Sequence, residues 1–206
     1  MAARKLQKEK TRTRLIEATT AELASGRTFD TLSLREVSKL AGIAPTSFYR
    51  HFHHMEDLGL ALLEEHGRSL FALMEDVRSH VTGGKSLIRA SVEAVYDFIF
   101  TNQGLSRMIV QESLSPESPF REASESLFLS ISSDLAEYLE QEAQERGVPL
   151  GYPRLAANAM VSIMFTTGIA LLNAPEADRD RHVDAAVIKL KMIMRGAEAM
   201  GAGNDG

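Results

Sequence analysis

The sequence predicts an all-α protein. Apolar residues recur at steps of three and four along most of the 206 residues, and no segment has the features of a convincing strand. Gly and Pro residues separate the periodic segments. With 44% hydrophobic and 25% charged residues, the composition is that of a globular protein long enough for one large or two small domains.

The first helix is expected over residues 7–24, where Leu15, Ala18 and Leu23 form an apolar stripe and Gly26 ends it. Two short helices follow within residues 33–52, and a long one runs from about residue 55 to the pair Gly83–Gly84. Further periodic segments predict helices around residues 88–102, 105–109, 120–147, 153–173 and 178–199. Residues 201–206 are expected to form a flexible tail.

The two short helices have clear start and stop signals. Ser33 and Glu36 have the spacing of a capping box, so the first should begin at Leu34. Gly42 supplies a left-handed stop, and Pro45 suits the first position of the next helix. Helical spacing predicts an apolar underside on the first helix, formed by Leu34, Val37, Leu40 and Ala41.

The second short helix has one apolar and one polar face. Ile43, Phe48 and Phe52 are expected to anchor it from below. The outer face then holds Thr46, Ser47, Tyr49, Arg50 and His51, whose hydroxyl, aromatic and cationic groups suit phosphates and base edges in a major groove. An ordinary pair of surface helices is the alternative, because this geometry also occurs in proteins that never bind DNA.

Charge is distributed unevenly along the chain. Residues 1–52 hold ten Lys or Arg and five acidic residues, whereas the other 154 residues hold thirteen basic and twenty-three acidic ones. A polyanion therefore attracts the N-terminal part and repels the rest, which favours docking in one orientation.

Phe29 to Leu58 resembles the TetR family of bacterial transcriptional regulators, through Ala41–Gly42 at the turn and Tyr49-Arg50-His51-Phe52 after it. The amino-acid sequence of residues 33–37 and 42–52 also resembles that of the FabR/DesT-type repressors of unsaturated fatty-acid synthesis. The resemblance implies a nine-helix fold with a DNA-binding domain at residues 1–54 and a ligand-binding and dimerisation domain at residues 55–200. DNA contacts are expected from Arg12, Ser33, Arg35, Pro45, Thr46, Ser47, Tyr49, Arg50 and His51.

The last helix has a heptad-like seam, formed by Val183, Val187, Leu190, Met194 and Ala197. In the family that the chain resembles, the last two helices pair with their copies, which implies a homodimer on a roughly palindromic double-stranded operator. Alternatively, the seam closes the core of its own subunit.

Soft and aromatic side chains concentrate between residues 98 and 165. Flexible Met side chains can adapt to apolar ligands, although Met and Phe residues at helical spacing are also typical of an ordinary hydrophobic core. The resemblance implies a pocket for long-chain acyl-CoA, with cations for its phosphates. Ligand contacts are expected from Phe98, Arg107, Met108, Phe120, Arg121, Phe128, Met164 and Phe165.

Other functions find little support. The chain has no Cys and no apolar run after its first basic residues, so we expect a cytoplasmic protein. Leu155 to Ala174 is uncharged, but its polar residues favour a buried bundle helix over a membrane span. Catalytic motifs and ligand-spaced metal clusters are absent, so we expect neither an enzyme nor a cofactor.

The sequence thus predicts a repressor of fatty-acid desaturation or unsaturated fatty-acid synthesis genes that responds to acyl-CoA. A TetR-type regulator of efflux or catabolic genes, responding to another hydrophobic molecule, is the alternative.

Overall fold

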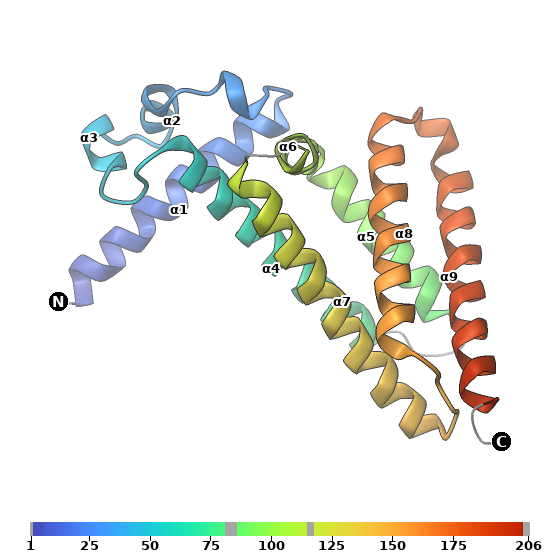
Figure 1. Cartoon of the computed structure of the whole chain (residues 1–206). Helices are drawn as coiled ribbons and strands as arrows, with labels where there is room; N and C mark the ends of the chain where they lie inside the picture. The colour runs from blue at the N-terminus through green and yellow to red at the C-terminus, as the bar shows by residue number, and fades with distance from the viewer. Residues whose placement is uncertain (1, 81–85, 115–117, 204–206) are drawn as a thin grey trace. The chain divides into compact units, whose positions relative to one another are not determined.

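A computed structural model describes residues 2–80, 86–114 and 118–203, with side chains from residue 6 onward. Within these ranges the chain forms nine α-helices and no strand (Figure 1). They are α1 (Ala2–Ala24), α2 (Leu34–Leu40), α3 (Pro45–Phe48), α4 (Met55–His80), α5 (Leu87–Thr101), α6 (Gln103–Ser113), α7 (Pro119–Arg146), α8 (Pro153–Asn173) and α9 (Arg179–Ala202). The predicted all-α class is confirmed. Two 3-10 turns, η1 (Phe29–Thr31) and η2 (Glu176–Asp178), were not predicted.

The helices form two compact units. The first unit comprises Met1–Ser69 and Asn102–Ser124, and the second comprises Leu70–Thr101 and Glu125–Gly206. Both α4 and α7 therefore run from one unit into the other.

The predicted signals around α2 and α3 are confirmed. The Ser33 side chain accepts a hydrogen bond from the Glu36 N–H, and the Glu36 side chain accepts one from the Ser33 N–H, which completes the capping box. Gly42 has a φ of 64°, in the left-handed region that favours glycine. Pro45 occupies the start of α3, which has no side-chain cap because Ala44 precedes it.

The second short helix is shorter than predicted. Regular α-helix ends at Phe48, and the chain continues as a tight turn in which the Arg50 and His51 N–H groups donate to the carbonyls three residues earlier. Phe48 and Phe52 are fully buried as predicted, with ring centroids 5.6 Å apart. The expectation for Leu40 is wrong, since this side chain is 52% exposed while Val37 and Ala41 carry the underside of α2.

Glycines bring backbones together in the first unit. A Cβ on Gly104 of α6 would lie 2.0 Å from the Leu23 carbonyl oxygen, so only glycine lets α6 approach the end of α1 so closely. A Cβ on Gly59 of α4 would lie 2.4 Å from Phe120, whose ring also packs edge-on against Phe29 at 6.3 Å. Residues far apart in sequence thus share this unit's core.

The core of the second unit lies among α5, α7, α8 and α9. Helices α8 and α9 form an antiparallel hairpin with α5 beside them (Figure 1). The predicted seam lies in this core: Val183, Val187 and Leu190 are buried within the chain itself, and Met194 packs against the same cluster. These residues therefore close their own subunit's core, as the alternative interpretation held.

Helix α8 is long and apolar enough to cross a membrane by length and composition alone. It is also a core helix, with Ala157, Met160 and Leu171 packed in the cluster of the second unit. Two ion pairs join its neighbours α5 and α9, Arg89 with Asp184 at 2.7 Å and Arg179 with Asp97. The hairpin is thus part of a packed bundle.

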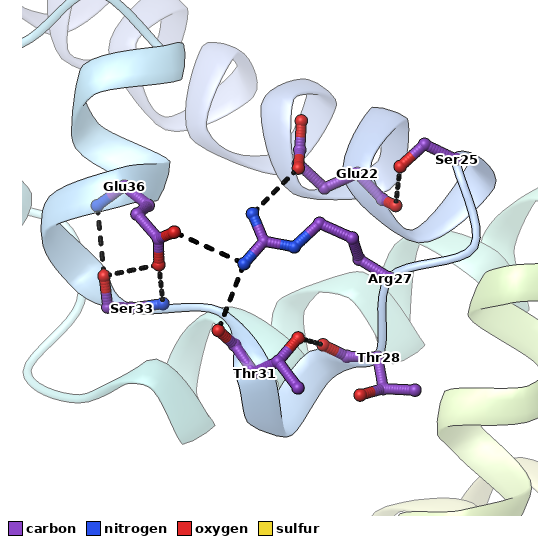
Figure 2. Close-up of polar contacts among 7 residues, drawn as sticks. All are labelled: Glu22, Ser25, Arg27, Thr28, Thr31, Ser33 and Glu36. Atoms are coloured by element: carbon purple, nitrogen blue, oxygen red, sulfur yellow. Dashed lines mark hydrogen bonds and ion pairs between the residues drawn. The ribbon is translucent and has the colours of Figure 1, made fainter.

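Arg27 connects three segments of the first unit (Figure 2). Its guanidinium donates to Glu22 of α1 at 3.1 Å, to the Thr31 carbonyl of η1 at 3.2 Å and to Glu36 of α2 at 3.3 Å. Glu36 is also the capping-box acceptor, bonded to the Ser33 hydroxyl at 2.7 Å and the Ser33 N–H at 3.0 Å. One carboxylate therefore caps α2 and ties it to α1.

We expect this contact to make the stability of the first unit depend on pH. The hydroxyl and N–H of Ser33, followed by Arg27, lower the pKa of Glu36 below its ordinary 4.5. A depressed folded-state pKa stabilises the fold above the unfolded value and loses this effect as pH falls through the folded value.

We expect Glu36→Gln to unfold more easily than wild type at pH 7, with the difference shrinking below pH 4.5. Gln retains the capping geometry, so the comparison isolates the charge. Urea unfolding followed by circular dichroism at both pH values measures it, with exposed Glu17→Gln on α1 as the control. A difference that stays constant with pH would contradict this assignment.

Candidate nucleic-acid interface

The turn that follows α3, residues 49–52, presents a cation and an aromatic ring to solvent. Tyr49 is 59% exposed and its ring stands edge-on to buried Phe48 at 6.0 Å. Arg50 and Thr46 are also exposed. Because Phe48 and Phe52 fix the turn from beneath, the Tyr49 and Arg50 side chains project from a well-anchored backbone.

Helix α1 supports this turn with two arginines. Arg14 donates to the Gly42 carbonyl at 3.3 Å, and its guanidinium fills the space where a Cβ on Gly42 would lie only 2.6 Å away. Arg12 lies over the Phe52 ring at 5.3 Å, a cation–π contact. Both ends of the segment from Gly42 to Phe52 are therefore held by α1.

His51 is half-buried rather than fully on the outer face, and Ser47 is half-buried too. Burial lowers the pKa of His51, and the nearby charges of Lys8, Arg12 and Arg50 lower it further. The imidazole is therefore neutral at pH 7. Its Nδ1 is buried without a hydrogen-bond partner. Three cations from α1 and the turn after α3 thus gather around a neutral ring, which makes a positively charged surface.

The other predicted DNA-binding residues lie in the same unit. Arg35 and Pro45 are exposed. Ser33 is exposed as well, but its hydroxyl already serves the capping box. The structure therefore brings all nine predicted DNA-binding residues into the first unit, and their contacts with DNA stay a prediction.

The predicted ligand-binding residues are divided between the units. Arg107, Met108, Phe120 and Arg121 belong to the first unit, and Phe98, Phe128, Met164 and Phe165 belong to the second. Phe120 is buried against Gly59 and Phe29, so its ring fills the core of the first unit. Phe165 is 47% exposed on α8. A ligand-binding role for this set stays a prediction.

Sequence patterns missed the residues that hold the interface in place. Arg14 contacts a carbonyl 28 positions away, and Arg27 joins acids on two helices. Neither contact has a spacing signal, because both arise from tertiary packing. Lys8 belongs to the basic N-terminal run that the sequence already shows, but its place beside His51 does not follow from the sequence.

No cluster of His, Cys, Asp or Glu suited to a metal ion occurs in the part of the chain that the structure describes. At the start of α4, the backbone N–H groups of His53 and His54 donate to the Asp57 carboxylate, at 2.7 and 3.3 Å.

Comparisons with known proteins agree with this geometry. Residues 16–62 match the family of bacterial regulatory proteins called the tetR family. A TetR-family transcriptional regulator from Streptomyces coelicolor is 20% identical, with a TM-score of 0.70 over 92% of this chain and 97% of that one. A transcriptional regulator from Cytophaga hutchinsonii is 16% identical, with a TM-score of 0.71 over 89% and 96% of the two chains.

A third similar structure is the transcriptional regulator FadR from Bacillus subtilis in complex with stearoyl-CoA. It is 17% identical, with a TM-score of 0.66 over 89% of this chain and 98% of that one. The matched segment contains Arg27, the capping box, α2, α3 and the turn with Tyr49 and Arg50. Residues 16–62 therefore match the model of the tetR family of bacterial regulatory proteins, and the chain as a whole has the fold of these solved transcriptional regulators.

Proposed function

We propose that the chain is a cytoplasmic, homodimeric repressor of fatty-acid desaturation or unsaturated fatty-acid synthesis genes, which binds a roughly palindromic operator and senses long-chain acyl-CoA. The observation that carries the DNA-binding part is the projecting pair Tyr49 and Arg50 on a turn held by Phe48, Phe52 and Arg14.

The exposed groups of Tyr49 and Arg50 determine which parts of DNA this surface can contact. Tyr49 offers a ring and a hydroxyl to base edges or a phosphate, and Arg50 offers donors to a guanine or a phosphate. Lys8 and Arg12 add positive charge from α1. Phosphate contacts of this kind release counterions, so affinity falls steeply with salt.

We expect Tyr49→Ala and Arg50→Ala each to weaken operator binding by roughly 5- to 150-fold, since one good base contact contributes about 1–3 kcal/mol. The thermal midpoint should stay unchanged because both side chains are exposed. Fluorescence anisotropy over a salt series checks this, with exposed Arg146→Ala on α7 as the control. Equal operator affinity of Arg50→Ala and Arg146→Ala would contradict the proposal.

The homodimer is proposed on the exposed face of the α8–α9 hairpin. With the seam of α9 inside its own core, other apolar residues stay uncovered: Leu155 and Phe165 on α8, and Ile188 and Met192 on α9, the last two being 59% and 68% exposed. Large apolar side chains gathered on one hairpin suit a self-complementary two-fold interface. A second copy then supplies the second recognition turn that a palindrome needs.

We expect the double variant Ile188→Glu, Met192→Glu to be monomeric, because four buried carboxylates would face one another across the two-fold axis. Light scattering after size-exclusion chromatography measures the mass. Leu129→Glu is the matched control, since Leu129 is 62% exposed on α7 of the same unit. If the double variant keeps the mass of the wild type as a dimer, or if wild type is itself a monomer, the hairpin interface is wrong.

Acyl-CoA sensing is supported by the resemblance at residues 33–52 and by a structural neighbour bound to stearoyl-CoA. The second unit has Met160 in its core and Met164 and Met194 packed against that core. Flexible Met side chains of this kind can adapt to an apolar acyl chain. Because α4 continues from this unit into the first, a ligand-dependent change of packing there biases the DNA-binding segment.

Titration of the operator with protein preincubated with stearoyl-CoA or oleoyl-CoA tests this proposal. We expect the straight and the cis-kinked chain to shift operator affinity in opposite directions, each by roughly 5- to 150-fold, corresponding to a coupling of about 1–3 kcal/mol. Free coenzyme A is the control. Identical affinities with both thioesters and without them would overturn acyl-CoA sensing. Thermal stabilisation by a planar cation but not by acyl-CoA would instead favour a regulator of efflux or catabolic genes.

A further inference from the structure

The turn between α2 and α3 consists of residues 41–44 and carries the whole change of direction between the two helices. Within it, the Gly42 N–H donates to the Lys39 carbonyl at 3.0 Å, and the Ile43 N–H donates to the Ser38 carbonyl at 2.9 Å. This pair of hydrogen bonds is the Schellman motif, which ends α2 with Gly42 in the left-handed region. The direction in which α3 leaves α2 therefore depends on the dihedral angles of very few residues.

Arg14 of α1 contacts this turn at the glycine. Its Nη2 donates to the Gly42 carbonyl at 3.3 Å, across 28 positions of sequence. The same nitrogen lies only 2.6 Å from the place where a Cβ on Gly42 would stand. Gly42 thus meets two requirements, a φ of 64° and room for a guanidinium group. The turn and the arginine are fitted to each other.

The helices around this contact are packed in series. Helix α1 packs against α2, and α2 packs against α3. Tyr49 and Arg50, both exposed, follow directly after α3. A change of the dihedral angles at Gly42 therefore moves α3 and these two side chains together relative to α1. Arg14 opposes such a change because it connects the turn directly to α1.

Movement of Tyr49 and Arg50 affects two kinds of DNA contact unequally. Hydrogen bonds to base edges need donors and acceptors that are held close to one geometry. The attraction of a positive surface to phosphates acts over a Debye length and tolerates small displacements. A contact that fixes the turn therefore matters more for distinguishing one sequence from another than for binding DNA in general.

We infer that Arg14 is a positioning residue for sequence selection: it acts through the Gly42 carbonyl, without touching DNA, and holds α3 so that Tyr49 and Arg50 meet base edges in one register. The inference rests on the proposed DNA binding and deepens it by naming a residue that turns general attraction into preference for one sequence. Direct binding of a phosphate by the same guanidinium is the competing role, and the experiment distinguishes the two.

Arg14→Ala is tested on two duplexes, one selected from a random pool by the wild-type protein and one of random sequence. We expect the ratio of the two affinities to fall about 2- to 12-fold, the range for one net hydrogen bond. The slope of log affinity against log salt should stay that of wild type. Loss of a phosphate contact would instead make this slope shallower by about 0.9 and weaken both duplexes alike, which would overturn the inference.

Lys8→Ala is the matched control, because it removes the same charge from an exposed position of the same helix. The ratio of affinities cancels the general attraction of a positive charge for DNA, so this control should leave the ratio unchanged. An equal fall of the ratio in Lys8→Ala and Arg14→Ala would contradict a positioning role for Arg14.

Gly42→Ala supplies a second variant. Its new Cβ would lie 2.6 Å from the Arg14 nitrogen and would have to displace the guanidinium. Once Arg14 is already Ala, this collision is gone and only the strain of an alanine at a φ of 64° remains. We therefore expect the double variant to lower the ratio by less than the product of the two separate fold-changes. Fold-changes that simply multiply would show that the two positions act independently.

Hydrogen exchange of the protein alone provides a readout that needs no DNA. The amides of Ile43, Arg50 and His51 donate to carbonyls in or beside the two turns that flank α3. We expect them to exchange about 2- to 12-fold faster in Arg14→Ala than in wild type or Lys8→Ala. Unchanged exchange would overturn the inference. If wild type selects no duplex, the proposed function fails and this inference with it, whereas equal ratios for wild type and Arg14→Ala on a selected duplex overturn the inference alone.

Discussion

The segment that matches the tetR family is held together at the guanidinium of Arg27. The guanidinium donates hydrogen bonds to Glu22 near the end of α1 and to Glu36 at the start of α2. It also donates to the Thr31 carbonyl, which lies between them in sequence. Because the Glu36 carboxylate also accepts from Ser33, the start of α2 and its placement on α1 are fixed by the same atoms. Arg14 does the equivalent at the other end of α2. The two arginines therefore hold both ends of α2 against α1.

Features that need only a few neighbouring residues could be predicted from the sequence. The capping box, the left-handed Gly42 and the start of α3 at Pro45 each depend on local geometry, and all three are confirmed. Burial of individual side chains was less accessible. Leu40 has the spacing of a core residue, yet it is 52% exposed, because periodicity identifies a face of α2 and not how far the neighbouring helices cover it.

Long-range packing explains the other differences. The spacing of Val183 and Leu190 predicts a buried stripe but cannot say whether it packs within the chain or against a copy, and the structure places it within. The sequence shows that Phe120 is apolar but not where its ring packs. The ring fits into the first unit because Gly59 has no side chain, and a Cβ there would lie 2.4 Å from it.

The contact of Gly104 with the Leu23 carbonyl limits how this protein can be recombined. A chimaera that exchanges only its first fifty or so residues with a relative would separate α1 from the helix against which its last turn is fitted. Graft boundaries that follow the chain would fail, whereas a graft that carries α6 along with α1 preserves the fit. Sequence changes on the exposed surface around Tyr49 leave this junction intact, whereas a side chain at position 104 would need a matching change at the end of α1.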